Sequence, residues 1–133
     1  MKGIRTAALL HDIGKLHVPF ELLNNPGHLK DIEFKLIKSH PQAGDDILES
    51  IEFPWPVART VQQHHERLDG SGYPAGLKGD SILLEARIIG VADAVERCRL
   101  AVLIAQVRGS MLLCRKSPRH GEVFMIPMRS TPA

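Results

Sequence analysis

Histidine and aspartate side chains that could bind metal ions are concentrated in a few short segments of this sequence. The candidate ligands are His11, Asp12, His40, His64, His65 and Asp93. His64 and His65 are adjacent, and neighbouring side chains on a helix point about 100° apart. We therefore expect them to serve different ions of a multinuclear centre rather than to share one. Nitrogen and oxygen ligands from several segments, with no cysteine among them, favour iron, manganese or another hydrolytic metal over structural zinc.

These motifs also have purely structural interpretations. A histidine pair can simply end a helix, and an isolated histidine beside an acid is more often structural than a ligand. Asp93 is more informative because it lies between Ala92 and Ala94 in an apolar segment. A buried carboxylate is strongly destabilising unless it is paired or ligates a metal. We therefore expect a cation next to Asp93.

A glycine-rich segment follows the histidine pair at residues 69–74, with the sequence Asp-Gly-Ser-Gly-Tyr-Pro. Gly70 and Gly72 allow backbone conformations that are closed to residues with a Cβ atom. Pro74 restricts the backbone where the segment ends. The sequence therefore predicts a loop of defined shape beside the candidate ligands. An ordinary Gly-Ser-Gly turn after a helix is the open alternative.

Apolar spacing predicts helices and no strand, with the candidate ligands near the ends or on the inner faces of four separate helices. Residues 4–13 are predicted to form a buried helix that Gly14 ends as a C-cap, with His11 and Asp12 in its last turn. Residues 17–27 are predicted to be a connector with one helical turn. Further helices are predicted over residues 30–38, 40–51 and 56–65, and from about residue 82 past Asp93. The predicted fold class is therefore all-α.

Composition limits the classes of protein to which the chain can belong. With 133 residues, of which 44% are hydrophobic and 24% charged, it has the size of one globular domain. A formal net charge of +2 is too small and too dispersed to indicate nucleic-acid binding. The apolar run at residues 100–105 is too short to cross or anchor in a membrane. Cys98 and Cys114 form no CxxC pair and no secretory signal is visible, so we expect a cytoplasmic protein.

Residues 7–95 resemble HD-GYP domains, a branch of the HD superfamily of metal-dependent phosphohydrolases. The resemblance rests on several motifs that follow one another in the family's order. They are Leu-Leu-His-Asp-Ile-Gly-Lys at 9–15, Pro-Gly at 26–27, His-Pro at 40–41, His-His-Glu-Arg-Leu-Asp-Gly-Ser-Gly-Tyr-Pro at 64–74, Gly-Leu-Lys-Gly at 76–79 and Ala-Arg-Ile-Ile-Gly-Val-Ala-Asp at 86–93. So many ordered matches exclude chance similarity.

The resemblance implies an all-α, HD-type helical bundle with two or three divalent metal ions, iron or manganese. It also implies hydrolysis of the bacterial second messenger cyclic di-GMP to pGpG or GMP. The six candidates above become metal ligands, and Asp12 and Lys15 become catalytic, with Lys15 beside the phosphate. The implied substrate-binding residues are Lys15, Asp69, Gly70, Gly72, Tyr73 and Pro74. Protein partners in signalling are expected as well.

The residue types fit this chemistry. Two cations can lower the pKa of a water molecule towards neutrality for in-line attack on a phosphodiester. The ammonium group of Lys15 would offset negative charge in the transition state. No side-chain nucleophile is then required.

Two departures from the family pattern predict weak or absent activity. The family usually has an upstream helix with a further histidine ligand, so the bundle is expected to be incomplete at its N-terminus. After Glu96 the usual Ala-Met and Arg-Pro-Tyr-Arg segments are replaced by other residues. Restoring one base after the Glu96 codon lets the codons of residues 97–113 encode that continuation. We therefore predict a partial HD-GYP domain at residues 1–96 and a frameshifted tail at residues 97–133 that is loosely packed or disordered beyond Gly109.

Two alternatives to an active phosphodiesterase stay open. The chain could be a catalytically inactive interaction module that binds metals or nucleotides, or a damaged gene product with neither function. Metal content and hydrolysis of cyclic di-GMP distinguish these hypotheses.

Overall fold

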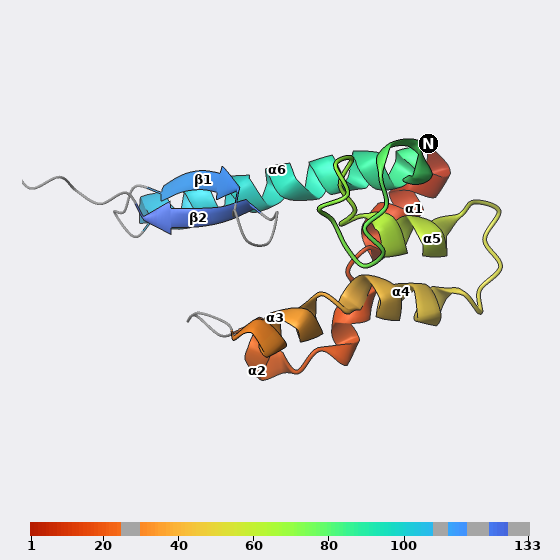
Figure 1. Cartoon of the computed structure of the whole chain (residues 1–133), viewed down its shortest axis with the longest axis horizontal. Coiled ribbons are helices and arrows are strands. Elements are labelled where there is room, and N and C mark those ends of the chain that lie inside the picture. The colour runs from red at the N-terminus through yellow and green to blue at the C-terminus, as the bar shows by residue number, and fades with distance from the viewer. Residues whose placement is uncertain (25–29, 108–111, 117–122, 128–133) are drawn as a thin grey trace, which may run out of the picture. The chain divides into compact units, whose positions relative to one another are not determined.

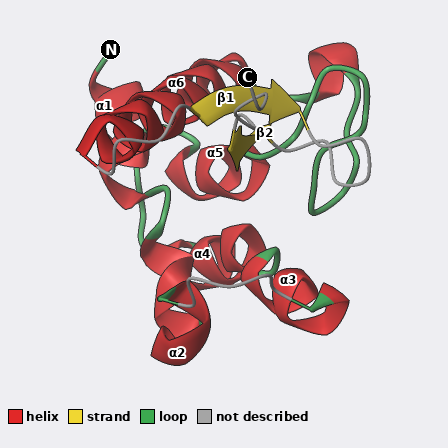
Figure 2. Cartoon of the chain, turned by 90° about the vertical axis from the view of Figure 1, so that its left-hand side faces the viewer, coloured by secondary structure: helices red, strands yellow, loops and turns green. Residues whose placement is uncertain are grey.

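The computed structural model describes residues 1–24, 30–107, 112–116 and 123–127 (Figure 1). Helices, red in Figure 2, dominate this part of the chain. The α-helices are α1 (Lys2–Leu10), α2 (Phe20–Leu23), α3 (Asp31–Ile37), α4 (His40–Leu48), α5 (Val57–Gln63) and α6 (Leu84–Val107). The other described elements are the 3₁₀ helices η1 (Ile13–His17) and η2 (Gly79–Ser81) and the strands β1 (Leu112–Lys116) and β2 (Val123–Pro127).

The chain divides into two compact units, residues 1–90 and 91–133. Helices α1 to α5 and the beginning of α6 belong to the first unit. The predicted all-α class is confirmed there, and each predicted helix is present with ends that differ by a few residues. Helix α6 is 24 residues long, but neither it nor any other helix in the described ranges has the length and apolar composition needed to span a membrane.

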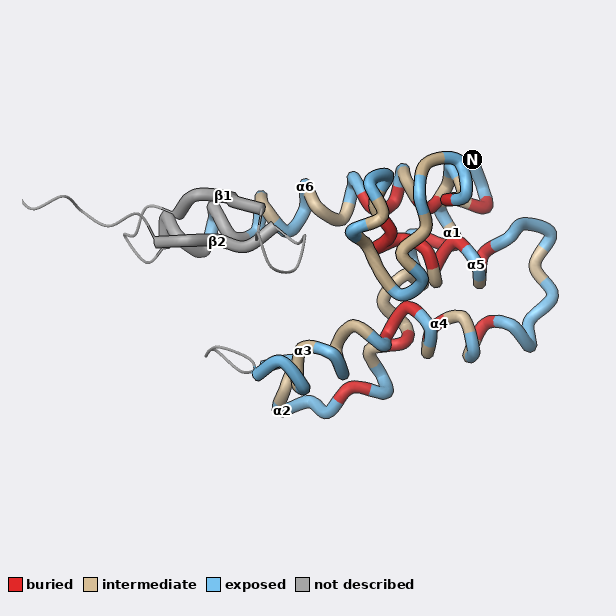
Figure 3. The backbone as a smooth tube through the Cα atoms, in the orientation of Figure 1, coloured by how far each residue is buried: buried red, intermediate tan, exposed pale blue. Residues whose placement is uncertain are grey.

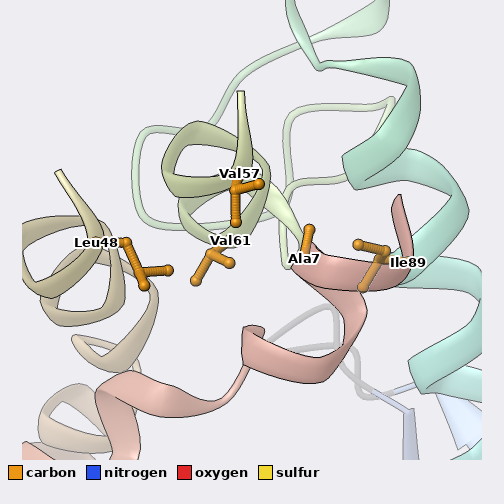
Figure 4. Packing of buried hydrophobic residues seen from close by; sticks show 5 residues of the cluster. All are labelled: Ala7, Leu48, Val57, Val61 and Ile89. Carbon is orange, nitrogen blue, oxygen red and sulfur yellow. The ribbon is translucent and has the colours of Figure 1, made fainter. Parts of the chain in front are cut away.

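Apolar side chains from four helices form the core of the first unit. Figure 4 shows them: Ala7 on α1, Leu48 on α4, Val57 and Val61 on α5, and Ile89 on α6. Buried stretches on α1, α4 and α5 are red in Figure 3. Full burial of a Val, Leu or Ile side chain contributes about 1.5–3 kcal/mol. The core therefore fixes α1, α4 and α5, whose ends carry the candidate ligands of the first unit.

The first helix ends earlier than predicted. Because α1 stops at Leu10, His11 is its C-cap and Asp12 precedes η1. Gly14 lies buried inside η1, so its prediction as a helix C-cap is wrong. Its role is close packing, since a Cβ atom at this position would lie 1.9 Å from the backbone oxygen of His40. Glycine thus lets η1 approach the backbone of α4.

The tail contains a two-stranded antiparallel sheet. Strand β1 pairs with β2, with Leu112 opposite Pro127 and Lys116 opposite Val123. The prediction that the chain contains no strand is therefore wrong for these segments, whereas the loose packing expected beyond Gly109 stays a prediction. The sequences Leu-Leu-Cys-Arg-Lys and Val-Phe-Met-Ile-Pro do not alternate apolar and polar residues, so the period of 2 on which a strand prediction depends is absent. Residues 108–111, 117–122 and 128–133 lie outside the described residues, and the frameshift after Glu96 stays a prediction.

Candidate metal centre

Three histidines that are distant in sequence meet in the first unit. His40 begins α4, and His64 and His65 directly follow α5; each offers a ring nitrogen within 4.8 Å of the others. The ring centroids of His40 and His65 lie 5.0 Å apart, and those of His64 and His65 lie 4.0 Å apart. All three side chains are buried. Such a group of imidazole nitrogens can hold a divalent metal ion.

His11 and Asp12 extend this group, and the four histidines are called the histidine cluster below. The ring centroid of His11 lies 5.3 Å from that of His64. The Asp12 carboxylate faces two histidines, with Oδ2 3.4 Å from Nε2 of His11 and Oδ1 3.5 Å from Nε2 of His40. A carboxylate beside two imidazoles would supply oxygen ligands to the same metal centre. The structure thus brings together all the candidate ligands of the first unit.

Backbone carbonyl groups orient most of these imidazoles. The Nδ1–carbonyl pairs are His11 with Ala8 and His40 with Ile37, both at 2.7 Å, and His64 with Val61 at 2.5 Å. When Nδ1 donates its hydrogen in this way, Nε2 carries the free lone pair. Nε2 of His40 and Nε2 of His64 are buried and have no hydrogen-bond partner among the described residues. A buried polar atom of this kind needs a partner, and a metal ion suits an oriented lone pair.

Electrostatics favour neutral histidines beside an ionised aspartate. Burial lowers the pKa of His64 to about 3 and also lowers the pKa of His40, so both rings are in the neutral form that binds metals. Burial raises the pKa of Asp12, but the hydrogen bond and positive charge of Lys15 outweigh it and leave that pKa lowered. Lys15 Nζ donates to Oδ2 of Asp12 at 2.6 Å. The donor set therefore fits a divalent cation.

Asp93 lies in the second unit, on α6, where its neighbour is a guanidinium group. Its Oδ2 lies 2.6 Å from Nη2 of Arg97, one helical turn later. The cation expected beside Asp93 is thus Arg97 in this structure. The role of Asp93 as a metal ligand stays a prediction.

A protein-family model described as an HD domain matches residues 2–109 of the chain. The chain belongs to the HD domain family. This confirms the resemblance drawn from the sequence, and it agrees with the helical fold of the first unit. HD domains are metal-dependent, and the buried histidines of this one could bind a metal ion.

Relatives of this HD domain are named as phosphodiesterases of cyclic dinucleotides. The 3'3'-cGAMP-specific phosphodiesterase 1 of Vibrio cholerae is 42% identical over 112 residues, which cover 84% of this chain and 25% of that protein. The cyclic di-GMP phosphodiesterase response regulator RpfG of Xanthomonas campestris is 45% identical over 95 residues, 70% of this chain and 25% of RpfG. A cyclic di-GMP phosphodiesterase of Thermotoga maritima is 43% identical over 95 residues, which cover 70% of this chain and 26% of that protein. The chain therefore spans about a quarter of the length of these relatives.

A buried glutamate that sequence analysis missed organises the loop of this HD domain. Glu66 is only 5% exposed. Its carboxylate accepts backbone hydrogen bonds from Ala75 at 2.7 Å, Gly76 at 3.0 Å and Leu77 at 2.9 Å. The sequence signal for this role is weak, since it consists of an acid between a histidine pair and a glycine-rich segment. Glu66 therefore joins the end of the loop to the segment that carries His64 and His65.

Tyr73 is the loop residue that reaches the histidine cluster of the HD domain. Its ring stacks on the ring of His65, with 4.7 Å between centroids and 25° between planes. The Tyr73–Pro74 peptide bond is cis. Tyr73 thus lies beside a candidate ligand, whereas the role of Tyr73 and Pro74 in substrate binding stays a prediction.

The other predicted loop residues shape the loop itself. Asp69 Oδ1 accepts hydrogen bonds from the backbone N–H of Ser71 at 2.9 Å and from its hydroxyl at 2.6 Å. Gly70 has a φ of +80°, in the left-handed region that favours glycine. A Cβ atom at Gly72 would lie 2.5 Å from Cα of Glu66, so this glycine allows close backbone packing. Their part in substrate binding stays a prediction.

The Glu66→Ala variant is expected to lose about 3 kcal/mol or more of unfolding free energy, because it removes three hydrogen bonds to a charged acceptor at about 1.5–3 kcal/mol each. Urea denaturation of the purified chain measures this loss. Glu49→Ala, at an exposed glutamate after α4, is the matched control and should change stability by less than about 0.5 kcal/mol. Equal stabilities of the two variants would contradict the role of Glu66.

Proposed function

We infer that this HD domain provides the metal centre of a phosphodiesterase that acts on cyclic dinucleotides. The observation that carries the proposal is the convergence of the histidine cluster and Asp12 from separate segments of the chain. Buried Nε2 atoms of His40 and His64 supply lone pairs for metal ions. The names of the relatives support the substrate class. We propose cyclic di-GMP as the substrate and pGpG or GMP as the product.

Each group in the site has a proposed task. The histidine cluster and Asp12 would hold two or three iron or manganese ions, and Asp93 would be a further ligand. These ions would polarise the phosphoryl oxygens and lower the pKa of a water molecule. Lys15, whose Nζ donates to Asp12, orients that carboxylate and places a positive charge where negative charge develops on the phosphate.

One contact favours low activity in this chain. Arg97 pairs with Asp93 at 2.6 Å, at a position where the HD-GYP pattern has alanine. A guanidinium group beside this carboxylate would compete with a metal ion for it. We therefore propose that hydrolysis is impaired. The second candidate function is an inactive interaction module that binds metals or nucleotides.

The test is the hydrolysis of cyclic di-GMP by the purified chain with Mn(II) or Fe(II). We expect turnover below the ordinary enzyme range of about 1–1,000 per second. Asp12→Ala should abolish the remaining turnover. Arg97→Ala should raise the turnover, whereas Arg99→Ala, at an exposed arginine of the same helix, should leave it unchanged. Turnover of the unmodified chain within the ordinary range would contradict impairment. Binding of Mn(II) and cyclic di-GMP without turnover in any variant would favour the interaction module, and a chain that binds no metal would refute the metal centre.

A further inference from the structure

Lys38 links the end of α3 to the glycine-rich loop. It is the C-cap residue of α3 and is half-buried. Its Nζ lies over two aromatic rings, 4.8 Å from the centroid of Phe34 and 4.8 Å from that of Tyr73. A cation within about 6 Å of a ring centroid is attracted to the face of the ring. The ammonium group is thus held between a ring of its own helix and a ring of the loop.

Tyr73 connects this contact to the histidine cluster. Its ring stacks on His65, and its backbone N–H donates to the carbonyl oxygen of His65 at 3.4 Å. Lys38, Tyr73 and His65 therefore form a continuous series of contacts, called the Lys38 stack below. The inner end of the Lys38 stack is one of the three histidines whose ring nitrogens lie within 4.8 Å of one another.

The orientation of an imidazole decides where its ligand nitrogen points. Backbone carbonyl groups set this orientation for His11, His40 and His64. For His65 the structure shows a face contact with Tyr73. The Tyr73 ring, together with the rings of His40 and His64, limits rotation of the His65 ring, so a group that holds Tyr73 in place also helps to hold His65.

We propose that Lys38 is a positioning residue of the metal centre, which holds Tyr73 against His65 and so directs the ligand nitrogen of His65. This inference rests on the proposed function and adds to it a residue outside the ligand motifs. Lys38 acts through two rings and needs no contact with metal or substrate. Loss of groups that orient metal-ligating histidines typically weakens metal binding about 10- to 100-fold.

The test compares Lys38→Met, which keeps an apolar side chain but removes the charge, with Lys38→Arg, which restores a cation. Lys35→Met, at an exposed lysine of α3, is the matched control. The sequence has a single tyrosine, so the ring resonances of Tyr73 are identified directly in NMR spectra of the metal-free chain. Titration calorimetry then gives the dissociation constant for Mn(II).

We expect Lys38→Met to shift the Tyr73 ring resonances and to weaken Mn(II) binding about 10-fold, the lower end of the range for such partners. Lys38→Arg should restore both properties, and Lys35→Met should leave both unchanged. Unchanged Tyr73 resonances in Lys38→Met would overturn the inference, as would unchanged Mn(II) affinity. A rise in KM for cyclic di-GMP with neither change would also overturn it, because Lys38 would then contact the substrate. Failure of the proposed metal centre is a separate outcome, in which the unmodified chain binds no Mn(II).

Discussion

The His64→Ala variant is expected to lose measurable Mn(II) binding at concentrations that saturate the unmodified chain. His64 is 0% exposed, and its ring centroid lies 5.3 Å from that of His11, 5.4 Å from that of His40 and 4.0 Å from that of His65. Its ring therefore contacts each of the other three rings of the histidine cluster. Loss of a ligand should exceed the about 10- to 100-fold effect of losing a group that only orients one. Titration calorimetry measures the change.

A folding defect could imitate this result, so two further variants accompany it. His17→Ala removes an exposed histidine of η1 and should bind Mn(II) as the unmodified chain does. Asp12→Asn keeps the size of a side chain that is 40% exposed, so it should fold normally and still bind Mn(II) more weakly. The metal centre would have to lie elsewhere if His64→Ala and Asp12→Asn both kept the affinity of the His17→Ala control.

The candidate ligands could be predicted because their signals are local. His11 with Asp12, and His64 with His65, are adjacent pairs of metal-binding residue types, and their spacing also carries the family resemblance. In the structure both pairs lie beside His40. Asp93 differs, because the argument for a cation beside a carboxylate holds equally for a metal ion and for Arg97. Chemistry of the residue type alone cannot distinguish these two partners.

The residues that support the site could not be predicted, because their roles depend on contacts between distant segments. Glu66 is an ordinary acid in the sequence, and its importance follows from three N–H groups that converge on it 9 to 11 residues later. In the sequence Lys38 resembles an ordinary surface lysine, whereas in the structure its ammonium group lies over the ring of Tyr73. Gly14 satisfies the local pattern of a helix C-cap, whereas its actual constraint is the backbone of α4. Local rules therefore find the candidate ligands and miss the residues that position them.

The Gly14→Ala variant is expected to lose at least about 3 kcal/mol of unfolding free energy, the upper end of the usual range for overpacking. The new Cβ atom would lie 1.9 Å from the backbone oxygen of His40 and 2.6 Å from the backbone nitrogen of Gly44. Both obstacles are backbone atoms, so no side-chain rotation can relieve the clash. Urea denaturation of the metal-free chain measures the loss.

The same substitution should also weaken Mn(II) binding, because η1 can escape the clash only by moving away from α4. Asp12 precedes η1 and His40 begins α4, so this movement would widen the 3.5 Å separation between their Oδ1 and Nε2 atoms. Gly79→Ala is the control: Gly79 has a φ of +51°, but an added Cβ atom would meet nothing within 4 Å, so only the left-handed backbone, about 1–2 kcal/mol, opposes the substitution. Gly79→Ala should therefore keep its Mn(II) affinity. If Gly14→Ala were no less stable than Gly79→Ala and bound Mn(II) equally well, close packing of η1 on α4 would not be what brings Asp12 to His40.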